Sequence, residues 1–213
     1  MAKTKRKIQL PQGYLSYSAR EMWLSDREKF IKIYFDRKDE YRTSNKGQEY
    51  GKVVATALEK GVDTGDVLTD SAMLLLPKYD IADQEIRAIL SIKEGDIEIL
   101  GRPDTLDSKT FAFREYKTGK HPWTEKKAQA HPQMKFYAML IYLKHKKIIT
   151  EAWLDWIETQ DTPKGIAPTG RVESFRVKIS LSDILKEMTL TAQVAKEIEI
   201  AYASHIPAPE IPF

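Results

Sequence analysis

The segment 103–117 contains three side chains that together could hydrolyse a phosphodiester. Asp104 and Glu115 are carboxylates, and Lys117 follows Glu115 by two positions. Two carboxylates held close together repel each other unless a cation lies between them, and such hard oxygen ligands suit Mg²⁺ or Mn²⁺. A neighbouring lysine can orient or deprotonate the attacking water and can counter the charge on the phosphate. Asp104, Glu115 and Lys117 are therefore the candidate catalytic residues.

A predicted hairpin brings these side chains together. Residues 97–106 and 111–118 have strand patterns, and residues 107–110 form the turn between them. A turn centred on the bond between residues 109 and 110 pairs residues whose numbers add to 219. Asp104 then lies opposite Glu115 and Arg102 opposite Lys117, with Cβ atoms about 4.5–5.5 Å apart. Because side chains alternate along a strand, Glu115 and Lys117 share a face with Phe113.

The same pattern has a simpler interpretation as a hairpin with two crossed salt bridges on a solvated face. Glu-x-Lys alone means little in a chain with 31% charged residues. The catalytic interpretation rests on the combination: an aspartate after Pro103, a turn, and Glu-x-Lys at the end of the next strand, just before Gly119.

At this point the sequence resembles a known family. Pro103-Asp104, ten further residues and Glu115-Tyr116-Lys117 form a literal PD-(D/E)XK motif, and the chain resembles the PD-(D/E)XK nuclease superfamily from about residue 16 to residue 142. The resemblance implies a restriction-endonuclease-like α/β (α+β) core with a central mixed sheet flanked by helices. It also implies that Asp104, Glu115 and the Tyr116 carbonyl bind the metal and that Lys117 acts on the water.

A second motif resembles the RecB-type and phage exonuclease branch of that superfamily. Gln133-Met-Lys-Phe-Tyr137 stands where that branch has Gln-x-x-x-Tyr, and residues four apart lie on one face of a helix. The resemblance implies that Gln133 and Tyr137 contact substrate near the scissile phosphate. An ordinary amphipathic helix would explain the pair if it stood alone.

An early helix carries the last candidate ligand. The stretch 47–54 resembles the family element that supplies an acid or a histidine, but Gly51 occupies the position of the histidine. Glu49 is the nearest candidate metal ligand, and an exposed glutamate on a helix surface is an equally good interpretation.

The remaining elements complete one α/β domain over residues 14–205. We expect helices from residue 18 to 35, capped by Ser18 and Glu21, from 44 to 61, ending at Gly61, from 66 to 79, from 124 to 143, interrupted or bent around Pro132, and from 182 to 202. Strands are expected over 84–93, which forms an antiparallel meander with the hairpin above, and over 150–158 and 171–179, with a polar loop at 160–170. Residues 1–13 are predicted as a flexible basic arm and 206–213 as an extended Pro-rich tail.

Composition excludes several function classes. The 213 residues contain no cysteine, which rules out disulfides, iron–sulfur clusters and a cysteine nucleophile. No stretch approaches the roughly 18 apolar residues of a membrane helix, so we expect a cytoplasmic protein, with a phage origin suiting its compact size. A net charge of +3 permits DNA as a partner without requiring it. No Walker motif occurs, so ATP-driven chemistry would need a recombination or helicase partner.

The tryptophans and two histidines have possible roles in stacking or packing. Trp123, beside Lys120 and Lys126, could stack on a single-stranded base, although packing is the default for a tryptophan. Trp153 and Trp156 lie three apart in a strand pattern, so they face opposite sides and one of them belongs to the core. His121 and His131 receive no primary role.

The sequence thus predicts a Mg²⁺-dependent DNA nuclease that acts in recombination, repair or phage DNA processing. The Gln-x-x-x-Tyr element favours an exonuclease. Two alternatives stay open: a structure-specific endonuclease, and a DNA-binding module that keeps the fold without turnover.

Overall fold

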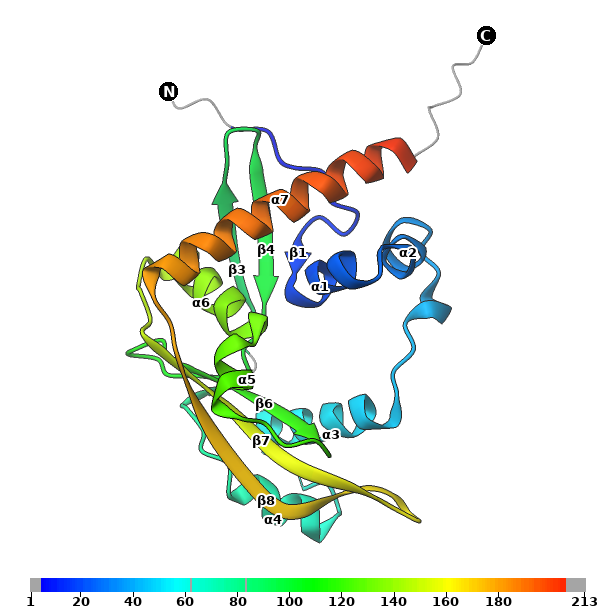
Figure 1. Ribbon diagram of the computed structural model, residues 1–213, viewed down its shortest axis with the longest axis vertical. Helices are drawn as coiled ribbons and strands as arrows, with labels where there is room; N and C mark the ends of the chain where they lie inside the picture. Colours follow the sequence, from blue (N-terminus) through cyan, green and yellow to red (C-terminus); the bar gives the residue numbers. More distant parts are fainter. Residues whose placement is uncertain (1–4, 62, 83, 206–213) are drawn as a thin grey trace.

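Two mixed sheets and their flanking helices make up the computed structural model, which describes residues 5–61, 63–82 and 84–205 (Figure 1). Sheet A has the order β1-β4-β3, and sheet B has the order β2-β5-β6-β7-β8. The strands are β1 (Leu15–Ser16), β2 (Ile81–Ala82), β3 (Ile86–Ser91), β4 (Asp96–Gly101), β5 (Thr105–Leu106), β6 (Phe113–Gly119), β7 (Glu151–Thr162) and β8 (Gly165–Lys178). The predicted α/β class, with mixed sheet flanked by helices, is confirmed.

The helices follow the predicted order. They are α1 (Tyr17–Ser25), α2 (Arg27–Phe30), the π-helical turn η1 (Ile31–Phe35), the 3₁₀ turn η2 (Asp39–Tyr41), α3 (Lys46–Lys60), α4 (Val67–Leu74), α5 (Glu125–Ala130), α6 (Pro132–His145) and α7 (Leu181–His205). Among the described residues, no helix combines the length and the apolar character that a membrane span requires.

The predicted three-stranded meander is wrong, because the strand expected over 97–106 is divided between the two sheets. β3 and β4 pair as an antiparallel hairpin, and β5 pairs with β6 in the other sheet. At Gly101 the chain lies so close to α6 that a Cβ atom would come within 2.8 Å of the Tyr137 and Leu140 side chains. Pro103 cannot donate a ladder hydrogen bond. The chain therefore leaves β4 at Gly101 and enters the second sheet at Thr105.

The predicted hairpin register is confirmed where the pairing exists. Thr105 pairs with Arg114 and Leu106 with Phe113, as numbers that add to 219 require. The ladder begins at Phe113 rather than at Phe111, which has a φ of 61°. Arg102 lies outside the ladder, so its predicted pairing with Lys117 is wrong; its Nη2 donates instead to Glu85 Oε2 at 2.7 Å.

The predicted polar loop at 160–170 is also wrong. β7 and β8 continue as one hairpin, with Thr162 paired to Gly165 across a two-residue turn and a bulge near residue 158. Gly165 has a φ of 126°, which a glycine adopts readily. Pro168 is tolerated because β8 is the edge strand of sheet B, where a missing N–H costs little.

Helix termini follow local chemistry, with two corrections. Asn45 and Gln48 form a capping box at the start of α3, and Gly61 ends that helix in the left-handed conformation, as expected. The predicted break before Pro132 is confirmed by the separation of α5 from α6. The predicted cap at Ser18 is wrong: the Ser16 hydroxyl accepts from Ala19 N at 3.3 Å. The first helix does not run unbroken to residue 35, since Asp26 ends α1 and caps α2.

The core lies mainly around α6, which packs against both sheet A and α7 (Figure 1). Trp156 is fully buried in this core, whereas Trp153 is half-buried on the other face of β7. Ile8 and Leu10 are buried as well, and Ile8 N donates to Asp96 O at 2.9 Å, so the chain from residue 5 on packs against the domain rather than extending as an arm. The predicted tail, 206–213, lies outside the described residues.

Candidate active site

β6 and α6 bring four predicted residues into one hydrogen-bonded cluster. Glu115 is only 4% exposed, and its Oε1 accepts from Lys117 Nζ at 2.8 Å and from Gln133 Nε2 at 2.6 Å. Lys117 Nζ also donates to Gln133 Oε1 at 2.7 Å, and Gln133 Nε2 lies 3.1 Å from the Tyr137 hydroxyl. Glu115 and Lys117, two residues apart on β6, point to one face of the strand, and Gln133 and Tyr137, four residues apart, lie on one face of α6. The packing of these two faces produces the cluster.

Asp104 reaches the same region from the segment between β4 and β5. Its Oδ2 accepts a 2.6 Å hydrogen bond from the backbone N–H of Tyr116, the residue after Glu115. Burial raises the pKa of the Tyr137 hydroxyl, and the negative charges of Glu115 and Asp104 raise that pKa further. Both carboxylates therefore act on one phenol. Asp104 is held by the β6 backbone, although it does not itself lie in a strand.

The electrostatics of Glu115 fit a cation ligand. Burial raises the pKa of its carboxyl group, and the Lys117 ammonium opposes that shift. Its Oε2 atom is buried, and no hydrogen-bond partner for it exists among the residues that the structure describes. A buried carboxylate oxygen without a donor is costly unless a donor or cation reaches it. The donor set of Asp104 and Glu115 thus suits a hard divalent ion.

Tyr116 can reach the cluster of Glu115 and Lys117 only through its backbone. Its side chain lies on the opposite face of β6, where the hydroxyl donates to Pro77 O at 2.9 Å and the ring packs with Ile157. Burial raises the pKa of this phenol to about 12.

Glu49 is not brought to the cluster. α3 packs through Val54 on the Tyr116 face of β6, where a Cβ atom at Gly51 would lie 3.1 Å from Thr118 Oγ1. Glu49 is exposed and accepts from Ser44 Oγ at 3.1 Å. Over the described ranges, no group of three or more aspartate, glutamate or histidine side chains is placed to hold a metal ion. Glu49 is consequently not placed to share a metal ion with Asp104 and Glu115.

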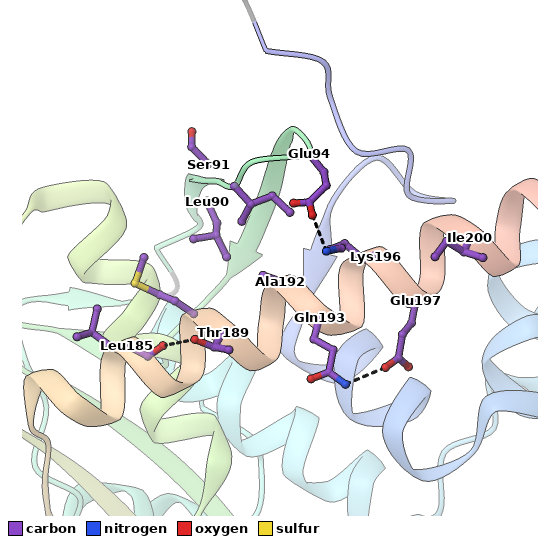
Figure 2. A pocket seen from close by; sticks show the side chains of 12 residues that line it. Leu90, Ser91, Glu94, Leu185, Thr189, Ala192, Gln193, Lys196, Glu197 and Ile200 are labelled. Atoms are coloured by element: carbon purple, nitrogen blue, oxygen red, sulfur yellow. Dashed lines mark hydrogen bonds and ion pairs between the residues drawn. The ribbon is translucent and has the colours of Figure 1, made fainter.

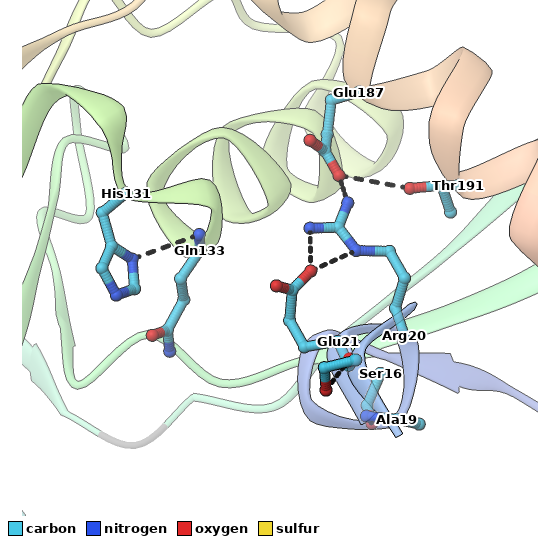
Figure 3. A network of polar contacts seen from close by, with 9 residues as sticks. Ser16, Ala19, Arg20, Glu21, His131, Gln133, Glu187 and Thr191 are labelled. Atoms are coloured by element: carbon cyan, nitrogen blue, oxygen red, sulfur yellow. Dashed lines mark hydrogen bonds and ion pairs between the residues drawn. The ribbon is translucent and has the colours of Figure 1, made fainter. Parts of the chain in front are cut away.

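A second polar network flanks the site and was not predicted. Arg20 on α1 is fully buried, donates to Glu21 Oε1 at 2.9 Å and pairs with Glu187 of α7 (Figure 3). Its guanidinium also lies 5.5 Å from the ring centroid of Tyr17, whose pKa is raised by burial and by the charges of Glu21 and Glu115. No local sequence signal identifies Arg20, because its partners come from distant segments.

The groove along α7 lies elsewhere. It has a volume of about 680 Å³ and runs beside the β3–β4 hairpin, with Leu90 and Leu185 among its lining residues (Figure 2). An ion pair between Lys196 and Glu94, at 2.7 Å, bridges helix and hairpin there. None of the predicted catalytic residues lines it, so this groove is separate from the β6–α6 cluster.

A strand that presents an acid and a lysine to one helix, with a second acid from the segment just before the neighbouring strand, is the arrangement of a restriction-endonuclease-like fold. The model of the PD-(D/E)XK nuclease superfamily matches residues 4–202, and the chain belongs to that superfamily. Its members generally use divalent metal ions.

One solved structure agrees with this fold, and a second matches it less well. A crystal structure from Eubacterium rectale, described as a "Putative exonuclease", has a TM-score of 0.58 and 7% sequence identity, covering 91% of this chain and 82% of that chain. The protein designated SSO0001 has a TM-score of 0.46 and 13% identity, covering 92% and 79% respectively. No curated protein sequence matches significantly.

Proposed function

We propose that this chain is a metal-dependent deoxyribonuclease that works as an exonuclease. The observation that carries the proposal is the Glu115 carboxylate, buried with one oxygen bound to Lys117 and Gln133 and the other without a donor among the described residues. Family membership supports nuclease chemistry. The exonuclease mode is supported by the Gln-x-x-x-Tyr element, whose two side chains contact each other beside Glu115.

Each residue of the site has a separate task in this proposal. Asp104, Glu115 and the Tyr116 carbonyl would hold a Mg²⁺ or Mn²⁺ ion, which when bound polarises the scissile phosphate. The Lys117 ammonium orients the attacking water and counters the negative charge that accumulates on the phosphate oxygens. Gln133 holds Lys117 and Glu115 in register, and Tyr137 fixes the amide of Gln133.

The test is digestion of three DNA substrates: an end-labelled linear duplex, a linear single strand and a covalently closed circle, each with Mg²⁺, Mn²⁺ or EDTA. We expect metal-dependent loss of the linear substrates, with the circle intact. Glu115→Gln and Lys117→Ala should abolish cleavage, whereas Lys144→Ala, at an exposed position near the other end of α6, should cleave like the wild type.

The other outcomes discriminate between the alternatives. Cutting of the closed circle would replace the exonuclease by an endonuclease at the same site. DNA binding without cleavage under any condition would indicate a module that keeps the fold without turnover. A Glu115→Gln variant that cleaves at the wild-type rate would overturn the site itself.

A further inference from the structure

Three aromatic rings line up beside the proposed active site, and we call them the aromatic row: Tyr17, His131 and Trp123. The ring centroids of Trp123 and His131 are 5.2 Å apart, and those of His131 and Tyr17 are 6.3 Å apart. Tyr17 begins α1, His131 separates α5 from α6, and Trp123 precedes α5. All three side chains are half-buried, so each keeps an exposed part.

The aromatic row adjoins the catalytic cluster directly. His131 Nδ1 accepts from the backbone N–H of Gln133 at 3.3 Å (Figure 3). The Gln133 side chain binds both Glu115 and Lys117. A strand whose phosphate lies at Lys117 therefore has its neighbouring nucleotides within reach of these rings.

Charge around the row suits a nucleic acid strand. Lys127 Nζ lies 4.2 Å from the Trp123 ring centroid, and both Lys126 and Lys127 are exposed. Burial, together with the charges of Lys117 and Lys127, lowers the pKa of His131 to about 4. The imidazole is consequently neutral at physiological pH and presents an aromatic surface without a charge of its own.

We propose that the aromatic row stacks unpaired bases of a single-stranded DNA end and thereby delivers that strand to the active site. Bases stack on tryptophan, tyrosine and histidine whatever the identity of the base, and the lysines beside the row, Lys126 and Lys127, bind the phosphates. On binding, the Lys127 ammonium moves from the Trp123 ring to a phosphate of the strand, and a base then stacks on the ring where the ammonium had been. This inference rests on the proposed function, since it names the substrate form that the site receives.

The experiment separates base stacking from phosphate attraction. Binding of a fluorescent twelve-nucleotide oligothymidylate and of an abasic oligomer with the same number of phosphates is measured by anisotropy in EDTA. The wild type should prefer the oligothymidylate. Trp123→Leu should weaken oligothymidylate binding roughly 5- to 100-fold and leave abasic binding unchanged. Lys127→Ala should weaken both probes by the same factor.

Two further variants keep the result interpretable. Trp123→Phe retains a ring and should keep most of the preference, even if the loss of volume lowers stability. Phe111→Leu is the matched control, because Phe111 stacks on His145 at 4.2 Å beside Lys147, at the opposite end of α6 from Gln133. It should bind both probes like the wild type.

Failure of this inference is distinguishable from failure of the proposed function. Equal binding of the two probes by the wild type, or an unchanged preference in Trp123→Leu, would overturn the stacking role even if the chain cleaves DNA. A preference that depends on Trp123 would support the row even if no cleavage occurs, because the assay contains no metal ion.

Discussion

Removal of Asp155 should strongly destabilise the fold while leaving the active-site face of β6 intact. Arg114 and Asp155 are 7% and 0% exposed, and they form a bidentate pair with Nε–Oδ2 and Nη2–Oδ1 distances of 2.8 and 3.0 Å. Ser174 Oγ donates to the same carboxylate at 2.5 Å. The pair joins neighbouring parallel strands, β6 and β7.

The expected magnitude follows from burial. In Asp155→Ala the guanidinium of Arg114 stays between the rings of Tyr79 and Trp153 without a counter-charge. Such a buried, unpaired charge costs about 3–5 kcal/mol, which for a domain of this size lowers Tm by roughly 6–20 °C. Replacing both partners, in Arg114→Met with Asp155→Leu, should restore stability to within about 2 kcal/mol of the wild type, since neither charge is then desolvated.

The free energy of unfolding is measured by urea denaturation, with circular dichroism as the probe. DNA cleavage is measured at a temperature well below the Tm of each variant. The double variant should cleave within a few-fold of the wild type, because Arg114 and Glu115 face opposite sides of β6. A loss below about 1 kcal/mol in Asp155→Ala, or a double variant as unstable as the single one, would refute the reasoning from a desolvated pair.

Three further predictions concern the site and its supports. Gln133→Leu should lower kcat about 10- to 100-fold with little change in Tm, because it releases Glu115 and Lys117 from their shared amide, and an unchanged kcat would contradict this role. The wild type should lose stability as pH falls below about 6.5 toward about 4, because the depressed pKa of His131 means that the unfolded chain binds the proton first. The urea midpoint of His131→Asn should fall less over that pH range. If the midpoints of the variant and the wild type fell in parallel with pH, His131 would not be the group responsible. Gly61→Ala, at a φ of 63°, should lower the free energy of unfolding by about 1 kcal/mol, and a stabilised variant would exclude strain there.

Much of the site was predictable because its geometry is local. Alternation along β6 places Glu115 and Lys117 on one face of that strand, and helical spacing places Gln133 and Tyr137 on one face of α6. Only the packing of α6 against β6 depends on the tertiary fold. The register of β5 against β6 follows from the turn at residues 107–110, where the Asp107 carboxylate accepts from the backbone N–H of Thr110 at 2.6 Å.

The parts that could not be predicted depend on distant contacts. The end of β4 at Gly101 is set by the close approach of α6, and no residue near position 101 in the sequence indicates that contact. The position of α1 depends on β1, a two-residue strand that pairs in parallel with β4, and this contact brings Arg20 and Tyr17 to the site. Pro168 and Gly170 favour a loop by composition, yet an edge strand accommodates both.

The division of the sheet itself shapes the site. In an unbroken meander the ladder would hold Asp104 directly opposite Glu115, and two facing carboxylates destabilise a strand pair unless a cation separates them. Because the chain leaves sheet A at Gly101, Asp104 instead approaches from a segment outside the strands and is held by the Tyr116 N–H, while Glu115 is held by Lys117 and Gln133. Each carboxylate thus accepts a hydrogen bond from the chain itself, so neither depends on a metal ion for its position. Glu115 Oε2 has no donor among the described residues, so under the proposed function this atom is the one at which a cation would offset the cost of burying the carboxylate.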